Sequence, residues 1–517
     1  MNAIIALLPI VLLFVLMMGF KMPGHKSAFI TLVVTILIAF FLPEQMNFAP
    51  EGYSQGLVWY AIIEGVLKAV FPILIIILMA IFSYNVLLES GEIEVIKKQF
   101  TSLTDDRGII VLLMVWGFGG ILEGMAGFGT AVAIPAAILI SLGFKPGFSA
   151  LVALIANSVP TGFGAVGVPV ITLAKEACGS DVSSEVICDI SSKVVLQLSP
   201  LLFILPFIIL MLTDSSKKAL LKNIILSIWV GGISFAVQYF VARYVGAETP
   251  AILGGIASVI GIIIYAKLFT KKKSNEREVQ EHFTFARSFK AWSVYLFILV
   301  FILLASPLVP AVHHFLKSNL VSQVALPIYP SGTYFKFGWL SNAGLMLFLG
   351  TLVGGLIQGV SFGKIMAVLA RTIVNLRKTV ITIISLVTIA SVMNFSGMIA
   401  VIATALVALT GSFYPLFAPL IGAIGTFVTG SDTSANILFG KLQANVAGQL
   451  GYADPNWLIA ANTTGATGGK IISPQSIAIA TASCDMPGKD GEILRSALPY
   501  AIGYIIVGGL VVYFGGL

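Results

Sequence analysis

The sequence predicts an all-α polytopic membrane protein, with about 12 transmembrane helices plus two opposed re-entrant hairpins in an inverted repeat. The 517 residues are 58% hydrophobic and only 10% charged, which is too apolar for the surface of a soluble domain. Many apolar runs are long enough to cross a bilayer. Two further regions are apolar but short, and each is interrupted by glycine and polar residues.

Lys and Arg residues between the apolar runs set the orientation. The basic loops, together with Lys145, hold 22 of the 30 Lys and Arg residues, so the positive-inside rule places them in the cytoplasm and both termini outside. The first run lacks a basic leader and a cleavage site, so we expect it to be retained. The expected spans are 3–20, 27–42, 57–88, 148–174, 194–212, 223–243, 250–269, 292–310, 339–360, 379–410, 457–482 and 497–517. The basic loops are 21–26, 89–107, 213–222, 267–291, 361–378 and 484–496.

The first short region has two apolar arms, Ile109–Leu122 and Thr130–Gly143, around the stretch "EGMAGFGT". Each arm has fourteen residues, or about 21 Å of helix, whereas the core of a bilayer is about 30 Å thick. The far ends carry Arg107 and Lys145, which places both of them in the cytoplasm. We therefore expect a re-entrant hairpin over 108–144. One long kinked helix, or two thin spans, are the alternatives.

A second region repeats this pattern. The polar tip "GSDTSAN" (430–436) separates the arms Leu416–Thr429 and Ile437–Leu450. The flanking segments "GSFYP" and "GYADPN" contain no Lys or Arg. We therefore expect a hairpin over 416–450 that enters the membrane from outside.

Each hairpin is followed by an apolar helix with a polar, glycine-rich interruption. These are "LIANSVPTGFGAVGVPVI" within 148–174 and "LIAANTTGATGGKIISPQ" within 457–482. The flanking spans run in opposite directions in the two halves, as in transporters built from inverted repeats with broken helices. The predicted division is an N-terminal repeat over 1–212, connecting helices and a cytoplasmic linker over 213–291, and a C-terminal repeat over 292–517.

Irregular backbone inside a bilayer survives only where it lines a polar cavity, so both tips and both interruptions are expected to meet at one site. Glycines let the backbone approach a ligand, and helix N-termini at the tips favour an anion without a buried arginine. The candidate binding residues are small or carry hydroxyl, amide or ammonium groups. They are Gly127, Gly129, Thr130, Asn157, Ser158, Thr161, Ser431, Thr433, Ser434, Asn436, Asn462, Thr463, Thr464 and Lys470.

A charged residue at the centre of a span costs about 2.5–3.5 kcal/mol, so each one invites a functional explanation. Glu123 and Asp432 stand at the two tips and are the expected proton carriers. The alternative is an ionised cap or an ion pair that only stiffens the tip. Lys470 either attracts a carboxylate or caps a helix end. Glu64 and Lys68 are spaced i, i+4 and are expected to neutralise each other.

Other classes of site are not predicted. The four histidines show no metal-ligand spacing, and no metal or cofactor is expected. "TTGATGGKIIS" departs from the Walker A motif at its first glycine and at its final hydroxyl residue. The net charge of +7 lies in the cytoplasmic loops, so no nucleic acid partner is expected. Cys178 and Cys188 share one loop and either pair or remain free thiols.

The blocks "EGMAGFGTAVAI", "LGFKP", "IANSVPTGFGAVGVP", "GSDTSANILFGKLQ" and "ANTTGATGGKIISPQSIAIA" resemble the signature blocks of the bacterial L-lactate permease family. They occur in the same order, and the resemblance covers most of the chain. It implies uptake of L-lactate, D-lactate or glycolate together with a proton across the inner membrane. The wider grouping with two hairpins resembles elevator-type anion transporters. The chain departs from many members at Thr130–Ala131, where they carry Ala-Pro.

The sequence thus predicts a secondary carrier whose partners are a small 2-hydroxy monocarboxylate, a proton and the lipid bilayer. A sodium-coupled carboxylate carrier is the alternative, and a membrane-embedded enzyme is a remote one. The preferred substrate and homo-oligomer formation stay open.

Overall fold

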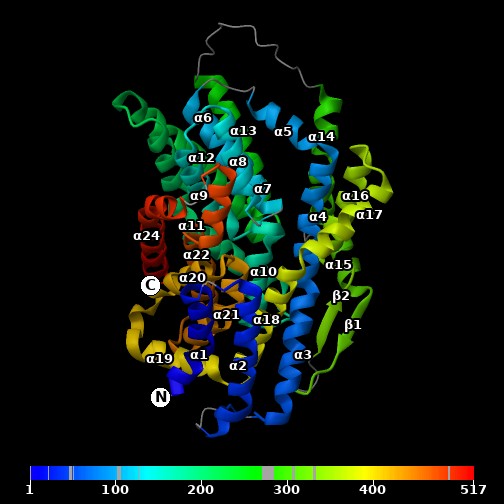
Figure 1. Ribbon diagram of the computed structural model, residues 1–517, viewed down its shortest axis with the longest axis vertical. Helices are drawn as coiled ribbons and strands as arrows, with labels where there is room; N and C mark the ends of the chain where they lie inside the picture. Colours follow the sequence, from blue (N-terminus) through cyan, green and yellow to red (C-terminus); the bar gives the residue numbers. More distant parts are fainter. Residues whose placement is uncertain are drawn as a thin grey trace.

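The computed structural model describes residues 2–516 except 21, 46–48, 51, 102–105, 126, 128, 270–283, 306–308, 330–333 and 487–488. The described part is almost entirely helical (Figure 1). Within it, β1 (Val321–Val324) and β2 (Phe335–Gly338) form one antiparallel sheet of two strands, with Val321 opposite Gly338. Most of the expected basic loop 267–291 lies outside the described residues.

The first half of the chain contains two helices interrupted by π-helical turns and one sharp helix break. Its elements are α1 (Asn2–Phe14), η1 (Val15–Gly19), α2 (Gly24–Gln45), η2 (Gln55–Leu57), α3 (Val58–Lys68), η3 (Ala69–Leu74), α4 (Ile75–Ser90), α5 (Glu92–Thr101), α6 (Arg107–Leu112), η4 (Leu113–Phe118), α7 (Gly119–Met125), α8 (Thr130–Ser141), α9 (Pro146–Thr161), α10 (Gly164–Cys178), α11 (Ser184–Thr213), α12 (Lys217–Tyr244) and α13 (Pro250–Phe269).

The second half begins after the gap at 270–283. Besides the two strands, its elements are α14 (Phe285–Ala305), α15 (Pro310–Ser318), α16 (Ala343–Ile357), α17 (Phe362–Asn375), α18 (Arg377–Phe395), α19 (Met398–Thr410), η5 (Gly411–Phe413), α20 (Tyr414–Thr429), α21 (Asp432–Gln449), α22 (Pro455–Lys470), α23 (Pro474–Ser483) and α24 (Asp490–Gly515).

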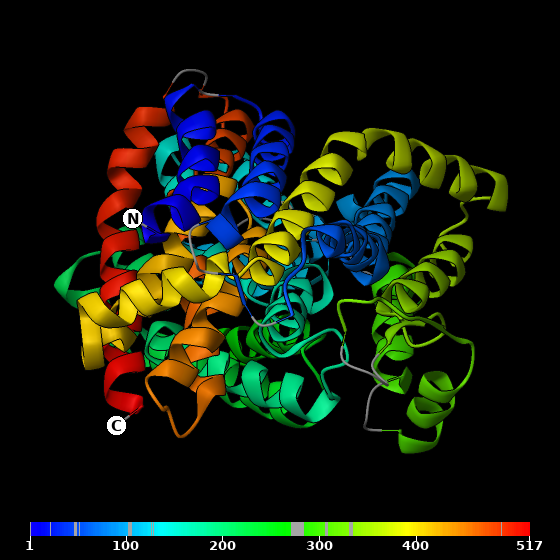
Figure 2. The ribbon, with the colours of Figure 1, turned by 90° about the horizontal axis from the view of Figure 1, so that it is seen from below.

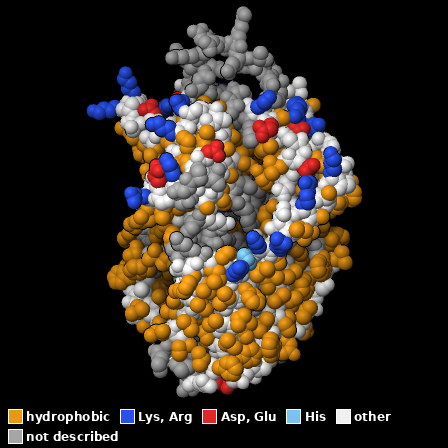
Figure 3. Space-filling view, viewed as in Figure 1, with side chains coloured by type: hydrophobic (Ala, Val, Ile, Leu, Met, Phe, Trp, Pro, Cys, Tyr) orange, Lys and Arg blue, Asp and Glu red, His pale blue; other side chains and the backbone are white. Residues whose placement is uncertain are grey.

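The surface of the protein is largely apolar, as expected for contact with lipid. Large hydrophobic side chains are widely exposed, for example Leu409 at 82% and Ile4 at 74%. Figure 3 shows hydrophobic side chains over the lower half of the visible face, while charged side chains gather above. In the described part, nine helices are long and apolar enough to cross a membrane, or ten if the bent pair α9–α10 counts as one span. The chain is therefore a multi-pass membrane protein.

Two expected spans are interrupted. The stretch 57–88 is divided into α3, η3 and α4, and Phe71 within η3 is non-helical, with φ −131° and ψ 117°. Pro72 follows directly and has no N–H to donate, which explains the interruption. The stretch 379–410 is divided into α18 and α19 at Gly397, whose φ is 81°.

The first arm of the expected hairpin is longer than predicted. Instead of fourteen residues, the helix runs through α6, η4 and α7 for 19 residues, Arg107–Met125. Nearly all of it is buried inside the protein, because α7 and η4 pack against α13 as well as α8. Its partner α8 has 12 residues, close to the expected length.

The glycines expected at the second interruption lie inside α22. An added Cβ at Gly465 would stand 1.6 Å from the carbonyl oxygen of Pro419, and one at Gly469 would stand 2.1 Å from that of Ala423. These glycines therefore let the backbones of α20 and α22 approach closely. The interruption comes slightly later, between Lys470 and Pro474.

Segments from the two halves pack side by side. The contacts include α10 with α21, α2 with α18, and α11 with α22. In Figure 2, the blue N-terminal helices accordingly lie beside the yellow-to-red C-terminal helices. This packing brings both expected tips to the same region of the protein.

Candidate functional site

A cavity of about 670 Å³ lies where four irregular segments of the chain meet. These segments are the α7–α8 tip, the α20–α21 tip, the break between α9 and α10, and the break between α22 and α23. Helices α2 and α18 contribute to the opposite wall. The lining residues are Gly24, His25, Ile77, Glu123, Gly127, Thr161, Gly164, Ala165, Val168, Pro169, Lys378, Thr379, Thr382, Ile383, Thr429, Gly430, Ser431, Asp432, Thr433, Ser434, Lys470 and Gln475.

Glu123 lies in the last turn of α7 and is 4% exposed. Its carboxylate rests against the α9–α10 break, since an added Cβ at Gly164 would stand 2.6 Å from Glu123 Oε1. Asn157 lies beside it, close enough to interact electrostatically. Within the described part, however, Glu123 Oε2 and both amide atoms of Asn157 are buried without a hydrogen bond. Buried polar atoms usually have a hydrogen-bond partner, so Glu123 and Asn157 are candidates to bind a ligand or a proton.

The break between α9 and α10 bends the chain by 48°. Ala165 and Val166 adopt φ of 45° and 61°, and Gly167 adopts 74°. The left-handed conformation costs a non-glycine residue about 1–2 kcal/mol. Strain of this kind is typical of functional segments, and here Ala165 and Gly164 line the cavity.

The second tip begins where α20 ends at Gly430, whose φ is 72°. Ser431 then caps α21, because its hydroxyl accepts a hydrogen bond of 3.2 Å from the Ser434 N–H. The first-turn N–H groups of Asp432 and Thr433 have no acceptor within α21 and lie at the cavity. They provide a local positive field.

Asp432 occupies this helix start and is 4% exposed. Thr161 and Thr426 stand near its carboxylate, yet neither oxygen of Asp432 has a partner of hydrogen-bonding geometry in the described part. Asp432 thus resembles Glu123 on the facing segment, because each is a buried acid with a carboxylate oxygen that lacks a hydrogen-bond partner among the described residues. The cavity therefore holds an unsatisfied carboxyl group from each half of the chain.

Lys470 ends α22 and links the two tips electrostatically. Its ammonium donates a hydrogen bond of 2.5 Å to the carbonyl oxygen of Gly430. Its charge also attracts the carboxylates of Glu123 and Asp432, without an ion pair to either. With Lys378 at the exposed mouth, two lysines face two acids in the lining. An incoming carboxylate therefore adds one net negative charge unless an acid takes up a proton.

The structure brings together eight of the sixteen residues expected at the site. Glu123, Gly127, Thr161, Ser431, Asp432, Thr433, Ser434 and Lys470 line the cavity. Gly129 and Thr130 begin α8 beside it, and the side chain of Thr130 lies outside the described part. Asn157 lies behind Glu123.

The remaining expected residues contribute to a buried polar network. Asn436 Nδ2 donates to the Pro169 carbonyl and to Thr463 Oγ1, each at 2.9 Å. Asn462 Nδ2 donates to Asn436 Oδ1, also at 2.9 Å. The Thr464 hydroxyl extends the network by donating to Gln197 Oε1 of α11 at 2.7 Å, whereas the Ser158 hydroxyl donates within α9, to the Ile155 carbonyl at 2.7 Å. These groups hold α10, α21 and α22 together.

Several lining residues were not among the expected ones. His25, Lys378, Thr379 and Thr382 come from α2 and α18, which belong to other parts of the sequence. The basic character of Lys378 was used only to orient the chain, and nothing in the local sequence indicates that α18 faces the tips. Gln475 also lines the cavity without having been expected there, but it does lie in a segment predicted to reach the site, at the end of the block "LIAANTTGATGGKIISPQ".

The ion pair expected between Glu64 and Lys68 and the state of two cysteines can also be read from the described part. Lys68 and Glu64 form an ion pair of 3.1 Å, and Tyr329 donates a hydrogen bond of 2.8 Å to Glu64 Oε1, so the neutralising pair is confirmed. Cys178 and Cys188 are free thiols. Among the described residues there is no group of three or more His, Cys, Asp or Glu side chains arranged to hold a metal ion.

A multi-pass helical protein with an interior polar cavity lined by two buried acids and two lysines is typical of membrane transport proteins. The family model for L-lactate permease matches residues 2–515. The chain belongs to the L-lactate permease family, and it is accordingly a bacterial permease and not an enzyme.

Curated relatives agree with this assignment. The chain is 40% identical to an L-lactate permease of Streptococcus iniae over 89% of this chain and 93% of the relative. It is 34% identical to the glycolate permease GlcA of Escherichia coli, over 99% and 95%. It is 32% identical to an L-lactate permease of Bacillus subtilis, over 97% and 93%.

Two solved transporters share the fold at low sequence identity. The YdaH transporter of Alcanivorax borkumensis has a TM-score of 0.51 and 15% identity, over 95% of this chain and 98% of that one. MtrF of Neisseria gonorrhoeae has a TM-score of 0.52 and 15% identity, over 93% and 94%. These likenesses concern the fold alone.

Proposed function

We propose that this chain imports L-lactate, and also D-lactate or glycolate, by proton symport across the cytoplasmic membrane. The observation that carries the proposal is the single cavity in which Glu123, Asp432 and Lys470 meet from the two halves of the chain. The relatives named as lactate and glycolate permeases support the substrate class.

Substrate recognition uses the positive end of the cavity. The carboxylate lies against Lys470 and the first-turn N–H groups of α21, while the 2-hydroxyl group meets Thr161, Thr433 or Ser434. Hydrogen bonds to a charged group contribute about 1.5–3 kcal/mol each. A monocarboxylate fits this arrangement better than a dicarboxylate, because Lys470 is shared with two acids.

Coupling follows from the charge balance of the lining. Glu123 and Asp432 together offset Lys470 and Lys378, so an anion binds most favourably when one acid is protonated. Proton and substrate then enter as a neutral pair, which lowers the cost of placing charge inside the protein. Glu123 is the first candidate carrier and Asp432 the second.

Sodium coupling is the second candidate. Asn157 Oδ1 and both oxygens of Asp432 have no hydrogen-bond partner among the described residues, and hard oxygen atoms are suitable ligands for Na⁺. A sodium ion there would replace the proton in the same charge balance.

The transport cycle is an elevator motion. The α7–α8 and α20–α21 pairs act as re-entrant hairpins of an inverted repeat and move with α9–α10 and α22–α23 against the remaining helices. The N- and C-terminal repeats are residues 1–212 and 292–517, joined by 213–291 within twelve spans, and both termini face outward. The convergence of both tips and both breaks on one cavity supports this arrangement.

Uptake by proteoliposomes tests the function. Labelled L-lactate is offered under an imposed pH gradient or an imposed sodium gradient, with D-lactate, glycolate, pyruvate and succinate as competitors. We expect accumulation with the pH gradient alone, and competition by D-lactate and glycolate but not by succinate. Accumulation that requires a sodium gradient and does not respond to the pH gradient would show that Na⁺, and not the proton, is the coupling ion. Failure to accumulate lactate under either gradient would reject the substrate.

A further inference from the structure

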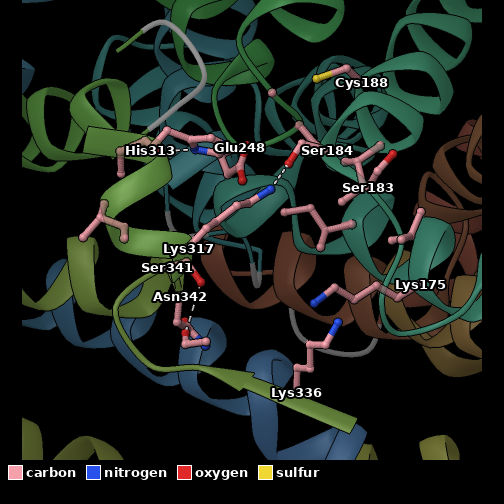
Figure 4. Close-up of a pocket in the computed structure, with 18 of the residues that line it drawn as sticks. Lys175, Ser183, Ser184, Cys188, Glu248, His313, Lys317, Lys336, Ser341 and Asn342 are labelled. Atoms are coloured by element: carbon pink, nitrogen blue, oxygen red, sulfur yellow. Dashed lines mark hydrogen bonds between the residues drawn. The ribbon is translucent and has the colours of Figure 1, made fainter. Parts of the chain in front are cut away.

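A second cavity, of about 390 Å³, lies at the other end of α10 from the central cavity (Figure 4). Gly164 and Val168 of α10 line the central cavity, whereas Ile171 and Lys175 line this one. Its other walls are the segment 180–184, the α12–α13 loop, α15, β2 and the start of α16. One helix thus connects both cavities.

The lining of the second cavity contains three lysines and two acids. Lys336 is paired with Asp181 at 2.6 Å. Lys317 donates a hydrogen bond to the hydroxyl of Ser184, as Figure 4 also shows. The side-chain ammonium of Lys175, in contrast, forms no hydrogen bond or ion pair with any described residue, and it points into the same part of the cavity as Lys336 (Figure 4).

The acids near Lys175 have other neighbours. Glu176 is buried and lines a small adjoining cavity together with Lys68 of α3 and Lys175 itself, and both lysines attract its carboxylate without forming an ion pair with it. Glu248 lies in the loop between α12 and α13, where burial raises the pKa of its carboxyl against the opposing charges of Lys317 and Lys175. Among the lysines of this lining, Lys175 is therefore the one whose ammonium has neither a hydrogen bond nor an ion pair with a described residue.

A second unsatisfied donor lies in the same cavity. Asn342 is 6% exposed and caps α16, because its Oδ1 accepts a hydrogen bond of 2.7 Å from the Gly344 N–H. This bond fixes Nδ2 as the remaining donor, which has no partner among the described residues. Apolar side chains such as Phe71 and Leu316 complete the wall.

We propose that this second cavity is a binding site for a small monocarboxylate anion, with the ammonium of Lys175 as its anchor. One carboxylate supplies the direct partner that the Lys175 ammonium lacks, the hydroxyl of Ser180 lies within the same lining, and the apolar wall accepts a methyl group. The ligand class rests on the proposed function, whereas the cavity and its unpaired lysine do not. The site lies along α10 from the central cavity.

Alkylation of a reporter cysteine tests this site in purified protein. Cys178, Cys188 and Cys484 are replaced by serine, and Ser180→Cys is introduced. Ser341→Cys, exposed on the opposite wall, serves as a second reporter. The rate of reaction with N-ethylmaleimide is measured with L-lactate, with uncharged lactamide and with chloride at equal ionic strength. We expect L-lactate alone to slow alkylation at least fivefold.

Three variants separate this site from the central one. Lys175→Met should abolish the protection, whereas Lys145→Met, an exposed lysine at the start of α9, should leave it unchanged. Lys470→Met should keep the protection although it impairs the central cavity. The proposal is overturned by equal protection from lactamide or chloride, by protection that survives Lys175→Met, by protection that is lost in Lys470→Met, or by no protection of either reporter. Because uptake is measured separately, a protein that transports lactate without such protection retains the proposed function and lacks only this site.

Discussion

The ammonium of Lys470 donates a hydrogen bond of 2.5 Å to the carbonyl oxygen of Gly430. This contact joins the end of α22 to the turn between α20 and α21. It places a positive charge between Glu123 and Asp432, which come from different halves of the chain. One lysine thus contacts the second tip directly and acts electrostatically on an acid from each tip.

Replacement of Lys470 by methionine removes the ammonium but retains the length of the side chain. We expect the KM for L-lactate to rise at least about tenfold, because a hydrogen bond to a charged group contributes about 1.5–3 kcal/mol. Lys470→Arg keeps the charge and should show a smaller rise. Initial uptake rates over a range of lactate concentrations provide the measurement, with Lys145→Met as the control. An unchanged KM in Lys470→Met would remove this lysine from the site.

Replacement of Glu123 by glutamine retains shape and removes the titratable proton. We expect this variant to lose accumulation driven by a pH gradient, because proton uptake no longer offsets the charge of the substrate. Exchange of labelled for unlabelled lactate across the membrane should persist, since it needs no net proton movement. Both are measured in the same proteoliposomes. Glu185→Gln, at an exposed acid in the first turn of α11, is the matched control.

Full uphill transport by Glu123→Gln would transfer the coupling role to Asp432. Asp432→Asn would then show the loss of accumulation with exchange preserved. Loss of both accumulation and exchange in Glu123→Gln would instead make Glu123 a binding residue, because a pure coupling residue leaves exchange intact.

Gly164 permits the close approach of Glu123 to the α9–α10 break. An alanine there would place its Cβ 2.6 Å from Glu123 Oε1, so the carboxylate must move. We expect Gly164→Ala to lower the rate of proton-driven uptake at least about tenfold, since small misplacements of a reacting group have large effects. Gly363→Ala, where an added Cβ meets open space, should transport normally. Normal uptake by Gly164→Ala would show that the position of this carboxylate is not critical.

Gly465 allows α20 and α22 to pack backbone to backbone. An alanine at this position would place its Cβ 1.6 Å from the Pro419 carbonyl oxygen, which requires the helices to separate. We expect Gly465→Ala to destabilise the protein by about 3 kcal/mol or more, the upper range for overpacking. The midpoint of thermal unfolding in detergent measures this effect. Gly448→Ala in α21, which meets open space, should leave the midpoint unchanged or raise it.

The meeting of the tips could be predicted from the sequence because lipid imposes a strict rule on the backbone. Interrupted apolar runs must surround a polar cavity, and Glu123, Asp432 and Lys470 stand at the interruptions. Family membership was evident from the same blocks and is confirmed by the whole-chain match.

The roles of the buried amide side chains and of the glycines could not be predicted as well from the sequence. Asn436 and Asn462 have the composition of a ligand site, but they bond to each other and to the protein. In the same way, Gly465 suits a helix break as well as it suits close helix packing. Which of these two roles a glycine has depends on the helix that packs against it, and the local sequence does not indicate which helix that is. The same holds for His25 and Lys378, whose place in the lining depends on how α2 and α18 pack.

Substrate protection of two cysteines tests most directly whether both halves of the chain build one carboxylate site. Thr161→Cys reports on the α9–α10 break and Thr433→Cys on the second tip, each in protein whose native cysteines are replaced by serine. We predict that L-lactate slows alkylation of both cysteines with the same half-maximal concentration, and that lactamide slows neither. Protection of only one of them, or half-maximal concentrations that differ about tenfold, equivalent to about 1.4 kcal/mol, would contradict a shared site.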